Sequence, residues 1–283
     1  MSDPISLCVL ADPYIRRWQV EALENAVVNG DCEVELVIIK QPEDPEIDQE
    51  TAAKAVNEPI GIDTVKLFIN LWRRERFWTF VLADRKLSEQ FFSASKLDDR
   101  VAVDEVSCFR TAMVRQVESI SDGDWDQLPL ETVKQVASTC DLVVRFGFGL
   151  LRGEILTAPK WGVVSFHPAD IRRYRGLGPP QVYLDGRNTI GVTLQRLTEE
   201  IDGGEIIAYE ETQISTTDTL WDVYRRVQEL QMDLLAKGIA NLRDPAYEPT
   251  VPPELGSYYS TDSRRRLSFA GRVLLKNAVR RIR

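Results

Sequence analysis

Histidine is almost absent from this chain of 283 residues, in which His167 is the only one. The four cysteines lie far apart in the sequence and form no Cys-x-x-Cys pair. These absences disfavour a metal centre built on histidine or paired cysteine ligands, and they also disfavour a disulfide framework. We therefore expect a protein that holds no metal and whose cysteines act as small apolar side chains.

Long apolar runs are absent as well. No uninterrupted stretch approaches the roughly 20 residues needed to cross a bilayer, and the start of the sequence has no basic region followed by a hydrophobic segment. Hydrophobic residues make up 43% of the chain and charged residues 28%, which are ordinary values for globular proteins. The sequence thus predicts a globular protein of the cytoplasm.

Negative charge dominates the chain, but it is unevenly distributed. The formal net charge is -9, yet residues 264–283 carry eight basic side chains and no acidic one. The remainder is therefore strongly acidic, which disfavours nucleic acid as a ligand because phosphate binding needs clustered lysine and arginine. We assign residues 1–250 to the main domain and residues 251–283 to a basic C-terminal tail that we expect to be helical.

Two roles of this tail remain open. Docking on the acidic body, within one chain or across a homodimer, is the simpler interpretation. Peripheral contact of residues 264–283 with an anionic membrane surface is the alternative, because their basic and apolar side chains alternate as in an amphipathic helix.

The first 40 residues have the pattern of a strand–helix–strand unit. Residues 5–10 and 34–39 are apolar runs typical of strands, and the segment between them places Trp18, Ala22 and Leu23 on one face of a helix. Such a unit has parallel strands and a right-handed crossover. The fold class predicted is therefore α/β, with a largely parallel central sheet.

The next segments carry less information. Residues 41–60 contain several prolines and carboxylates and predict a solvated loop, or a short helix at most. Residues 63–92 have a helical pattern rich in aromatic side chains. Core packing is the favoured interpretation of this aromatic stripe, and a surface for a partner or a wall of a substrate site is the alternative.

Three predicted strands in the second half of the chain run into polar or glycine-bearing loops. Residues 141–149 end in Gly147 and Gly149, residues 162–167 end on His167, and residues 192–197 lead to Asp202. Ligands of open α/β sheets bind at the carboxyl ends of strands. A histidine and an aspartate at neighbouring strand ends predict acid/base chemistry.

These segments resemble the folate-dependent formyltransferase family. Its signature is Asn-x-His-Pro, then Tyr-Arg-Gly, then Asp-x-Gly at the end of the next strand. Here Ser165-Phe166-His167-Pro168, Tyr174-Arg175-Gly176 and Asp202-Gly203-Gly204 occupy those places in order, and His167 and Asp202 are 35 positions apart. The core of the resemblance covers residues 140–235, and in type it is closest to sugar N-formyltransferases and methionyl-tRNA formyltransferase-like proteins.

The resemblance implies a three-layer, Rossmann-like formyltransferase fold and a one-carbon transfer reaction. The formyl donor would be 10-formyltetrahydrofolate and the acceptor a primary amine, with no metal involved. By this resemblance His167 donates a hydrogen bond or a proton to the developing oxyanion. Asp202 holds the imidazole or accepts, through water, the proton that leaves the amine.

Ser165 departs from the family signature, which has an asparagine that acts as an oxyanion donor. A serine hydroxyl is shorter, and loss of a well-placed donor commonly lowers the rate by about 10²-fold or more. Gln181 or a backbone N–H near Gly176 are candidate replacements. Two alternatives to the transferase therefore stay open, a catalytically impaired folate-binding or assembly module and a formyltetrahydrofolate hydrolase.

The resemblance also implies two sets of binding residues. The folate pterin would lie between two loops, in contact with Phe146, Gly147, Phe148, Gly149, Leu150 and Leu151 of one loop and with Ile201, Gly203 and Gly204 of the other. Arg172, Arg175 and Gln181, near His167 in the sequence, would bind the acceptor, because arginines suit a diphosphate.

Elimination among the relatives favours a nucleotide-linked amino sugar as the acceptor. Methionyl-tRNA formyltransferases carry an additional oligonucleotide-binding barrel of roughly 80–100 residues, whereas only about 40 follow the last long helical pattern here. Glycinamide ribonucleotide formyltransferases place a Gly/Ser-rich loop after the first strand, where this chain has Ala11-Asp12-Pro13-Tyr14. A hydrolase would carry a regulatory domain before the first strand. The expected partner is therefore a small-molecule amine.

Overall fold

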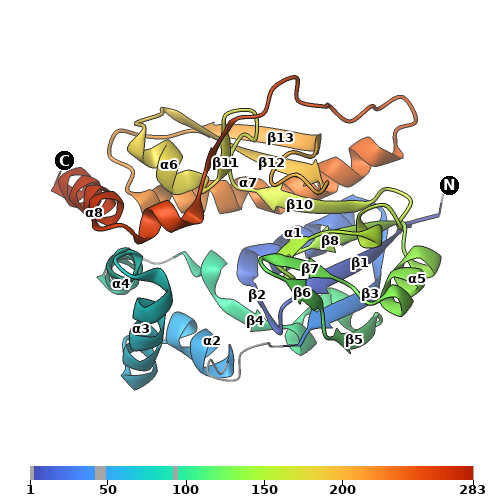
Figure 1. The fold of residues 1–283 in the computed structure, drawn as a ribbon, viewed down its shortest axis with the longest axis horizontal. Helices are drawn as coiled ribbons and strands as arrows, with labels where there is room; N and C mark the ends of the chain where they lie inside the picture. The colour runs from blue at the N-terminus through green and yellow to red at the C-terminus, as the bar shows by residue number, and fades with distance from the viewer. Residues whose placement is uncertain (1–2, 42–48, 92–94, 283) are drawn as a thin grey trace.

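A seven-stranded sheet forms the centre of the molecule (Figure 1), in a computed structural model that describes residues 3–41, 49–91 and 95–282. The strand order is β13-β12-β10-β8-β1-β3-β5. All neighbouring pairs from β10 to β5 are parallel, and β12 is antiparallel to both of its neighbours. The strands are β1 (Ile5–Ala11), β3 (Cys32–Lys40), β5 (Met113–Val117), β8 (Leu142–Arg145), β10 (Val163–His167), β12 (Thr189–Arg196) and β13 (Glu205–Gln213).

Two apolar layers enclose this sheet, and β1 shows why its sequence is apolar throughout. Leu7 and Val9 pack into the core on the side of α1 (Arg17–Asn29) and α7 (Leu220–Arg243). Cys8 and Leu10 pack into a second core on the side of α5 (Leu130–Thr139). A strand covered on both faces has no solvent side on which to alternate. The predicted α/β class with three layers and a largely parallel sheet is confirmed.

The predicted strand–helix–strand unit is also present. Strands β1 and β3 are parallel, and α1 between them buries Trp18, Ala22 and Leu23 together with Val20 and Ala26. Outside the central sheet, a short strand β2 (Tyr14–Arg16) pairs with β4 (Arg100–Ala102). The shorter elements that complete this part of the fold are β6 (Ile120–Asp122), β7 (Trp125–Gln127), β9 (Leu150–Leu151) and the 3₁₀ turns η1 (Lys96–Asp98), η2 (Val103–Glu105), η3 (Ser107–Phe109) and η4 (Glu154–Leu156).

The aromatic segment forms helices that stand apart from the sheet (Figure 1). In the described residues between β3 and β4 there are three helices, namely α2 (Gln49–Asn57), α3 (Ile62–Glu75) and α4 (Trp78–Phe91). The expected short helix within residues 41–60 is α2, and residues 42–48 of that stretch lie outside the described residues. The chain turns between α3 and α4 at Arg76, which has a φ of 51°.

Core packing explains only part of the aromatic stripe. Trp78 of α4 is buried and Phe77 before it packs against the core, whereas Phe80 of α4 is 46% exposed. Helix α3 has no buried residue, and Trp72 on it is 36% exposed. The prediction is wrong for α3 because this helix packs on α2 and α4 rather than on the sheet. Residue 92, the predicted end of the stripe, lies outside the described residues.

The basic tail is part of the same body as the sheet. Its strand β14 (Ser257–Tyr259) pairs with β11 (Tyr174–Gly176). After the turn η5 (Thr261–Arg265), helix α8 (Leu267–Ile282) packs against α4 and α6 (Pro179–Leu184) and buries Ala270, Val273 and Asn277. In this structure the tail therefore docks on its own chain, while the membrane contact and the homodimer stay predictions. No helix in the described part of the chain is both long and apolar enough to cross a membrane.

One carboxylate on α4 joins these helices. Asp84 accepts hydrogen bonds from Trp221 Nε1 at 3.0 Å, from Asn277 Nδ2 at 3.0 Å and from both terminal nitrogens of Arg281, at 2.6 and 3.0 Å. Burial alone would raise the pKa of Asp84, but the hydrogen bonds from Arg281, Trp221 and Asn277 lower that pKa below its usual value. Asp84 thus connects α4 to α7 and α8.

Replacement of this carboxylate should loosen the tail. We expect Asp84→Asn to lower the free energy of unfolding by about 1–3 kcal/mol. The reason is that Trp221, Asn277 and Arg281 then no longer donate to a charged acceptor. Urea unfolding followed by tryptophan fluorescence measures this difference. The matched control Asp63→Asn removes a carboxylate that pairs with Lys66 at the partly exposed start of α3, and it should change the free energy of unfolding by less than about 0.5 kcal/mol. Equal effects of the two variants would contradict the role of Asp84.

Candidate active site

The candidate site is built on β10, where alternate side chains serve two different faces. Ser165 and His167 point to one side, and the intervening Phe166 points to the other. There Phe166 stacks on Phe146, with ring centroids 6.0 Å apart, and meets the edge of Trp18 at 5.4 Å. This aromatic group fixes β10 against α1 and thereby fixes the positions of Ser165 and His167.

Asp202 reaches His167 by a route that the sequence did not indicate. Because β12 is antiparallel to β10, its last residue Arg196 pairs with Val164 near the start of β10. The two strand ends therefore do not meet at one edge, and that expectation is wrong. The loop after β12 folds back instead, and Asp202 in it has a φ of 48°. Glycine is required at position 204, because a Cβ there would lie 1.9 Å from the Arg196 carbonyl oxygen.

The returning loop brings the two predicted catalytic residues together. Asp202 Oδ1 lies 3.1 Å from His167 Nδ1. The same carboxylate accepts hydrogen bonds from the Gly176 backbone N–H at 2.8 Å and from Gln195 Nε2 at 3.1 Å. Burial would raise the pKa of Asp202, but the hydrogen bond and charge of His167, with the bonds from Gly176 and Gln195, lower it to about 2. Asp202 is therefore ionised at neutral pH.

The imidazole of His167 is closed on both sides. Its Nε2 lies 2.9 Å from the carbonyl oxygen of Tyr174, and the residue is only 3% exposed. Both ring nitrogens therefore face acceptors of the chain itself. His167 can reach a substrate only after the segment Tyr174–Gly176 moves away from Nε2.

Arg145 lies beside Ser165, and the sequence analysis assigned it no catalytic role. Its Nη2 and Nε lie 3.0 and 3.3 Å from Ser165 Oγ, and its other terminal nitrogen bonds the Gly149 carbonyl oxygen. Burial lowers the pKa of Arg145, while the carboxylates of Asp202 and Asp12 act in the opposite direction. The available signal was an arginine directly after the buried run Leu142–Val144. A guanidinium therefore contacts the hydroxyl of the residue that replaces the family's asparagine.

The loop predicted to contact folate divides into structural and accessible positions. Phe148 and Leu151 are 0% and 2% exposed and belong to the second core. Gly147 allows close approach of the chain after β1, because a Cβ there would lie 2.6 Å from the Asp12 backbone nitrogen. Of this loop Gly149 is exposed and Leu150 partly buried.

On the facing loop, Ile201 and Gly203 are partly accessible and Gly204 is buried. The glycines Gly147 and Gly204 thus serve the fold at positions where contact with a flat heterocycle was expected. Folate contact stays a prediction, and Gly149, Leu150, Ile201 and Gly203 offer the accessible surface for it.

The three predicted acceptor-binding residues are engaged within the chain. Arg175 holds the Asp202 loop, through Nε to the Ile201 carbonyl oxygen at 2.9 Å and Nη2 to Glu200 Oε1 at 3.0 Å. Arg172 Nε donates to Asp170 at 2.7 Å and its guanidinium lies over the Tyr209 ring. Gln181 Nε2 donates to Asp185 at 2.8 Å. These contacts stabilise loops, and a role of the three residues in acceptor binding stays a prediction. Over the described ranges, His, Cys, Asp and Glu side chains form no group of three or more that could hold a metal ion.

Comparison with known proteins identifies the part of the chain that contains this site. Residues 124–239 match the formyl transferase family model. Similar curated proteins include the methionyl-tRNA formyltransferases of Fusobacterium nucleatum, 31% identical over 40% of this chain and 37% of the relative, and Halorhodospira halophila, 30% identical over 48% and 44%. Residues 124–239 are thus similar to the formyl transferase family, as the sequence motifs predicted. The matched stretch spans less than half the length of these curated relatives.

Solved structures share the fold over most of the chain. A sugar N-formyltransferase from Shewanella sp. superposes with a TM-score of 0.56 at 17% identity, over 96% of this chain and 87% of the other. An N-formyltransferase from Helicobacter canadensis, in complex with folinic acid and dTDP-3-aminofucose, gives 0.55 at 16% identity, over 96% and 80%. At such identities the likeness extends to the fold alone.

The depressed pKa of Asp202 predicts how stability depends on pH. Its ionised form contributes about 2 kcal/mol, a contribution fully present above about pH 4 and lost as pH falls toward 2. We expect Asp202→Asn to lower the free energy of unfolding by about 2 kcal/mol at pH 7 and by about half as much at pH 3. Urea unfolding at the two pH values measures this.

The exposed neighbour Glu200 offers the control in the same loop. Glu200→Gln should change the free energy of unfolding by less than about 0.5 kcal/mol at both pH values. An Asp202→Asn effect that is the same at pH 7 and pH 3 would show that the carboxylate is not held ionised by its donors.

Proposed function

We propose that this protein transfers a formyl group from 10-formyltetrahydrofolate to a primary amine. The observation that carries the proposal is the contact of 3.1 Å between His167 Nδ1 and Asp202 Oδ1, within the segment that matches the formyl transferase family. The remaining groups of the site are compatible with acyl transfer, which needs a proton carrier and a stabilised oxyanion.

The reaction begins with attack of the unprotonated amine on the formyl carbon, which forms a new C–N bond and places a negative charge on the formyl oxygen. His167 donates a hydrogen bond to this oxygen once the Tyr174 carbonyl has released Nε2. Asp202 keeps the imidazole oriented and accepts, through water, the proton that the amine loses. The oxyanion then re-forms the carbonyl as the bond from the formyl carbon to N10 of the folate breaks, and N10 takes up, through water, the proton that the amine gave to Asp202.

Arg145 and Ser165 together take the place of the missing asparagine in this proposal. Ser165 Oγ accepts from the guanidinium, at 3.0 Å from Nη2, so its own proton is free to point toward the developing oxyanion. The positive charge of Arg145 adds electrostatic stabilisation in a site that is largely shielded from water. This arrangement supports catalysis over the alternative of an inactive binding module.

The acceptor in this proposal is a small molecule that carries an amine and an anionic group. The Helicobacter canadensis structure contains dTDP-3-aminofucose, and this supports nucleotide-linked amino sugars as a first class to test. The family also contains methionyl-tRNA formyltransferases, and a formyltetrahydrofolate deformylase from Pseudomonas syringae shares the fold with a TM-score of 0.50. Transfer and hydrolysis therefore have to be separated by experiment.

Release of tetrahydrofolate from 10-formyltetrahydrofolate, with a panel of anionic primary amines that includes nucleotide-linked amino sugars and amphiphilic amines, and with no acceptor, tests the proposal. We expect acceptor-dependent release. His167→Asn, which retains a donor toward Asp202 but lacks Nε2, should lower kcat at least 100-fold. Arg145→Gln should lower it about 100-fold through loss of the charge beside Ser165.

Arg225→Gln, on the exposed side of α7, is the control for loss of one arginine and should keep the wild-type kcat. Release without acceptor would indicate a hydrolase. Folate binding without any release would indicate a binding module. Full activity of His167→Asn would show that the reaction takes place elsewhere.

A further inference from the structure

A large cleft lies between the sheet and the helices that follow β3. Its volume is about 990 Å³, at the upper end of the range for small-molecule sites. Helices α2, α3 and α4 form one side, and Asp12 and Arg100 belong to the other. Helix α3, which does not pack on the sheet, thus contributes to a wall of this cleft.

Apolar, mainly aliphatic side chains form most of this wall. Leu67, Phe68 and Leu71 come from α3, Ala53 from α2 and Leu82 from α4. Val65, also in the wall, is 55% exposed. Apolar surface of this extent, left in contact with water, is typical of a site that a ligand or partner covers.

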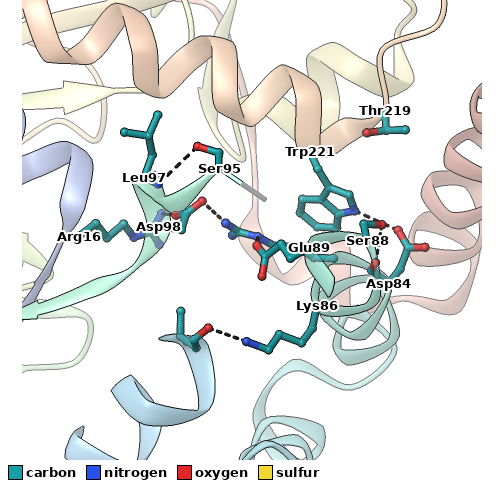
Figure 2. Close-up of polar contacts among 12 residues, drawn as sticks. Arg16, Asp84, Lys86, Ser88, Glu89, Ser95, Leu97, Asp98, Thr219 and Trp221 are labelled. Atoms are coloured by element: carbon teal, nitrogen blue, oxygen red, sulfur yellow. Dashed lines mark hydrogen bonds and ion pairs between the residues drawn. The ribbon is translucent and has the colours of Figure 1, made fainter. Parts of the chain in front are cut away.

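Positive charge gathers in the same cleft although the whole chain is acidic. Of the described residues that line it, seven are cationic and four are carboxylates, whereas the net charge of the chain is -9. Asp98 accepts from Arg16 Nη1 at 3.1 Å and also from Arg85, whose Nε donates to Glu89 at 2.7 Å. Figure 2 shows Arg16 and Asp98 facing one another, with Glu89 and Lys86 on the neighbouring helix α4.

Arg16, Arg85 and Arg100 form a cationic cluster in this cleft. The guanidinium of Arg100 makes no hydrogen bond or ion pair with the described residues. Its backbone is held firmly, since the N–H donates to Asn57 Oδ1 at 2.6 Å and the carbonyl accepts from Asn57 Nδ2 at 2.8 Å. Burial lowers the pKa of Arg100 to about 10, and the charges of Arg16 and Arg85 act in the same direction against that of Asp12. Among the described residues, Asp12 is the carboxylate whose charge acts on Arg100, and the guanidinium of Arg100 therefore suits an anionic group.

We propose that this cleft binds an amphiphile, with its anionic group, a phosphate or a similar group, on Arg100, Arg16 and Arg85 and its aliphatic chain along the wall formed by α3. The aliphatic part of this wall, Val65, Leu67 and Leu71, favours a chain over a nucleoside because such side chains offer no group to hydrogen-bond a base.

The cleft also adjoins the candidate active site. Asp12 lines it and lies against the loop of Gly147, which leads from Arg145. The charge of Arg145 acts on Asp12. We therefore identify the amphiphile as the amine acceptor, a step that rests on the proposed function, whereas binding in the cleft does not.

Calorimetric titration of the full chain with octyl phosphate, below its micelle concentration, tests the binding. Inorganic phosphate, octanol and uridine diphosphate serve as probes for the anion, the chain and a nucleotide. We expect octyl phosphate to bind at least tenfold more tightly than each of the other three. Arg100→Gln should weaken it at least tenfold, and Arg100→Lys should weaken it less because the charge is kept.

Two further variants separate the chain from the charge and the cleft from the catalytic site. Leu71→Asn should weaken octyl phosphate binding without changing that of inorganic phosphate. His167→Asn should bind octyl phosphate as the wild type does, so that failure of formyl transfer leaves the cleft result intact. Arg115→Gln, an exposed arginine on β5 outside the cleft, controls for the loss of one positive charge.

The proposal is overturned if octyl phosphate binds no more tightly than inorganic phosphate, or if Arg100→Gln and Arg115→Gln behave alike. Tighter binding of uridine diphosphate than of octyl phosphate would also overturn it, in favour of a nucleotide site. If octyl phosphate binds as expected but a primary amine with an octyl phosphate group is not formylated while an amino sugar is, the cleft is a binding site and its ligand is not the acceptor.

Discussion

The carboxylate of Asp202 is the group on which the arrangement of this site depends. An ionised carboxylate that is largely shielded from water is stable only with donors around it, and here those donors come from three segments: His167 on β10, the Gly176 N–H on β11 and Gln195 on β12. Strand β11 in turn pairs with β14 of the tail. One carboxylate thereby connects the centre of the sheet to the C-terminal part of the chain.

This connection has a consequence for catalysis. The segment that supplies the Gly176 N–H to Asp202 also places the Tyr174 carbonyl on His167 Nε2. Strand β11 is held in place by close contact with β14 of the tail. The contact is so close that a Cβ on Gly176 would lie 2.3 Å from the Tyr259 carbonyl oxygen. The same strand pair therefore both orders the site and covers its histidine. In the proposed reaction, His167 Nε2 becomes accessible when β11 and β14 shift while the bond between His167 and Asp202 is kept.

The sequence was most informative where one residue type had one structural meaning. Apolar runs identified β1, β3, β8 and β10, and the ordered motifs around His167 and Asp202 identified these two residues as a pair. It failed where function and fold use the same residue. In the sequence, Gly147 and Phe148 are compatible both with a loop that contacts a cofactor and with a tight turn packed in the core. The close approach of Asp12 to Gly147 in the structure favours the tight turn. The exposure of α3 was equally hidden, since an aromatic helix has the same pattern in a core and along a cleft.

A crystal structure of the protein with 5-formyltetrahydrofolate tests the central claim most directly. The account predicts that the formyl oxygen lies within hydrogen-bond distance of His167 Nε2, with the Tyr174 carbonyl displaced and the contact of His167 with Asp202 retained. A folate bound away from Ser165 and His167, or a His167 Nε2 still bonded to Tyr174 in the complex, would contradict it.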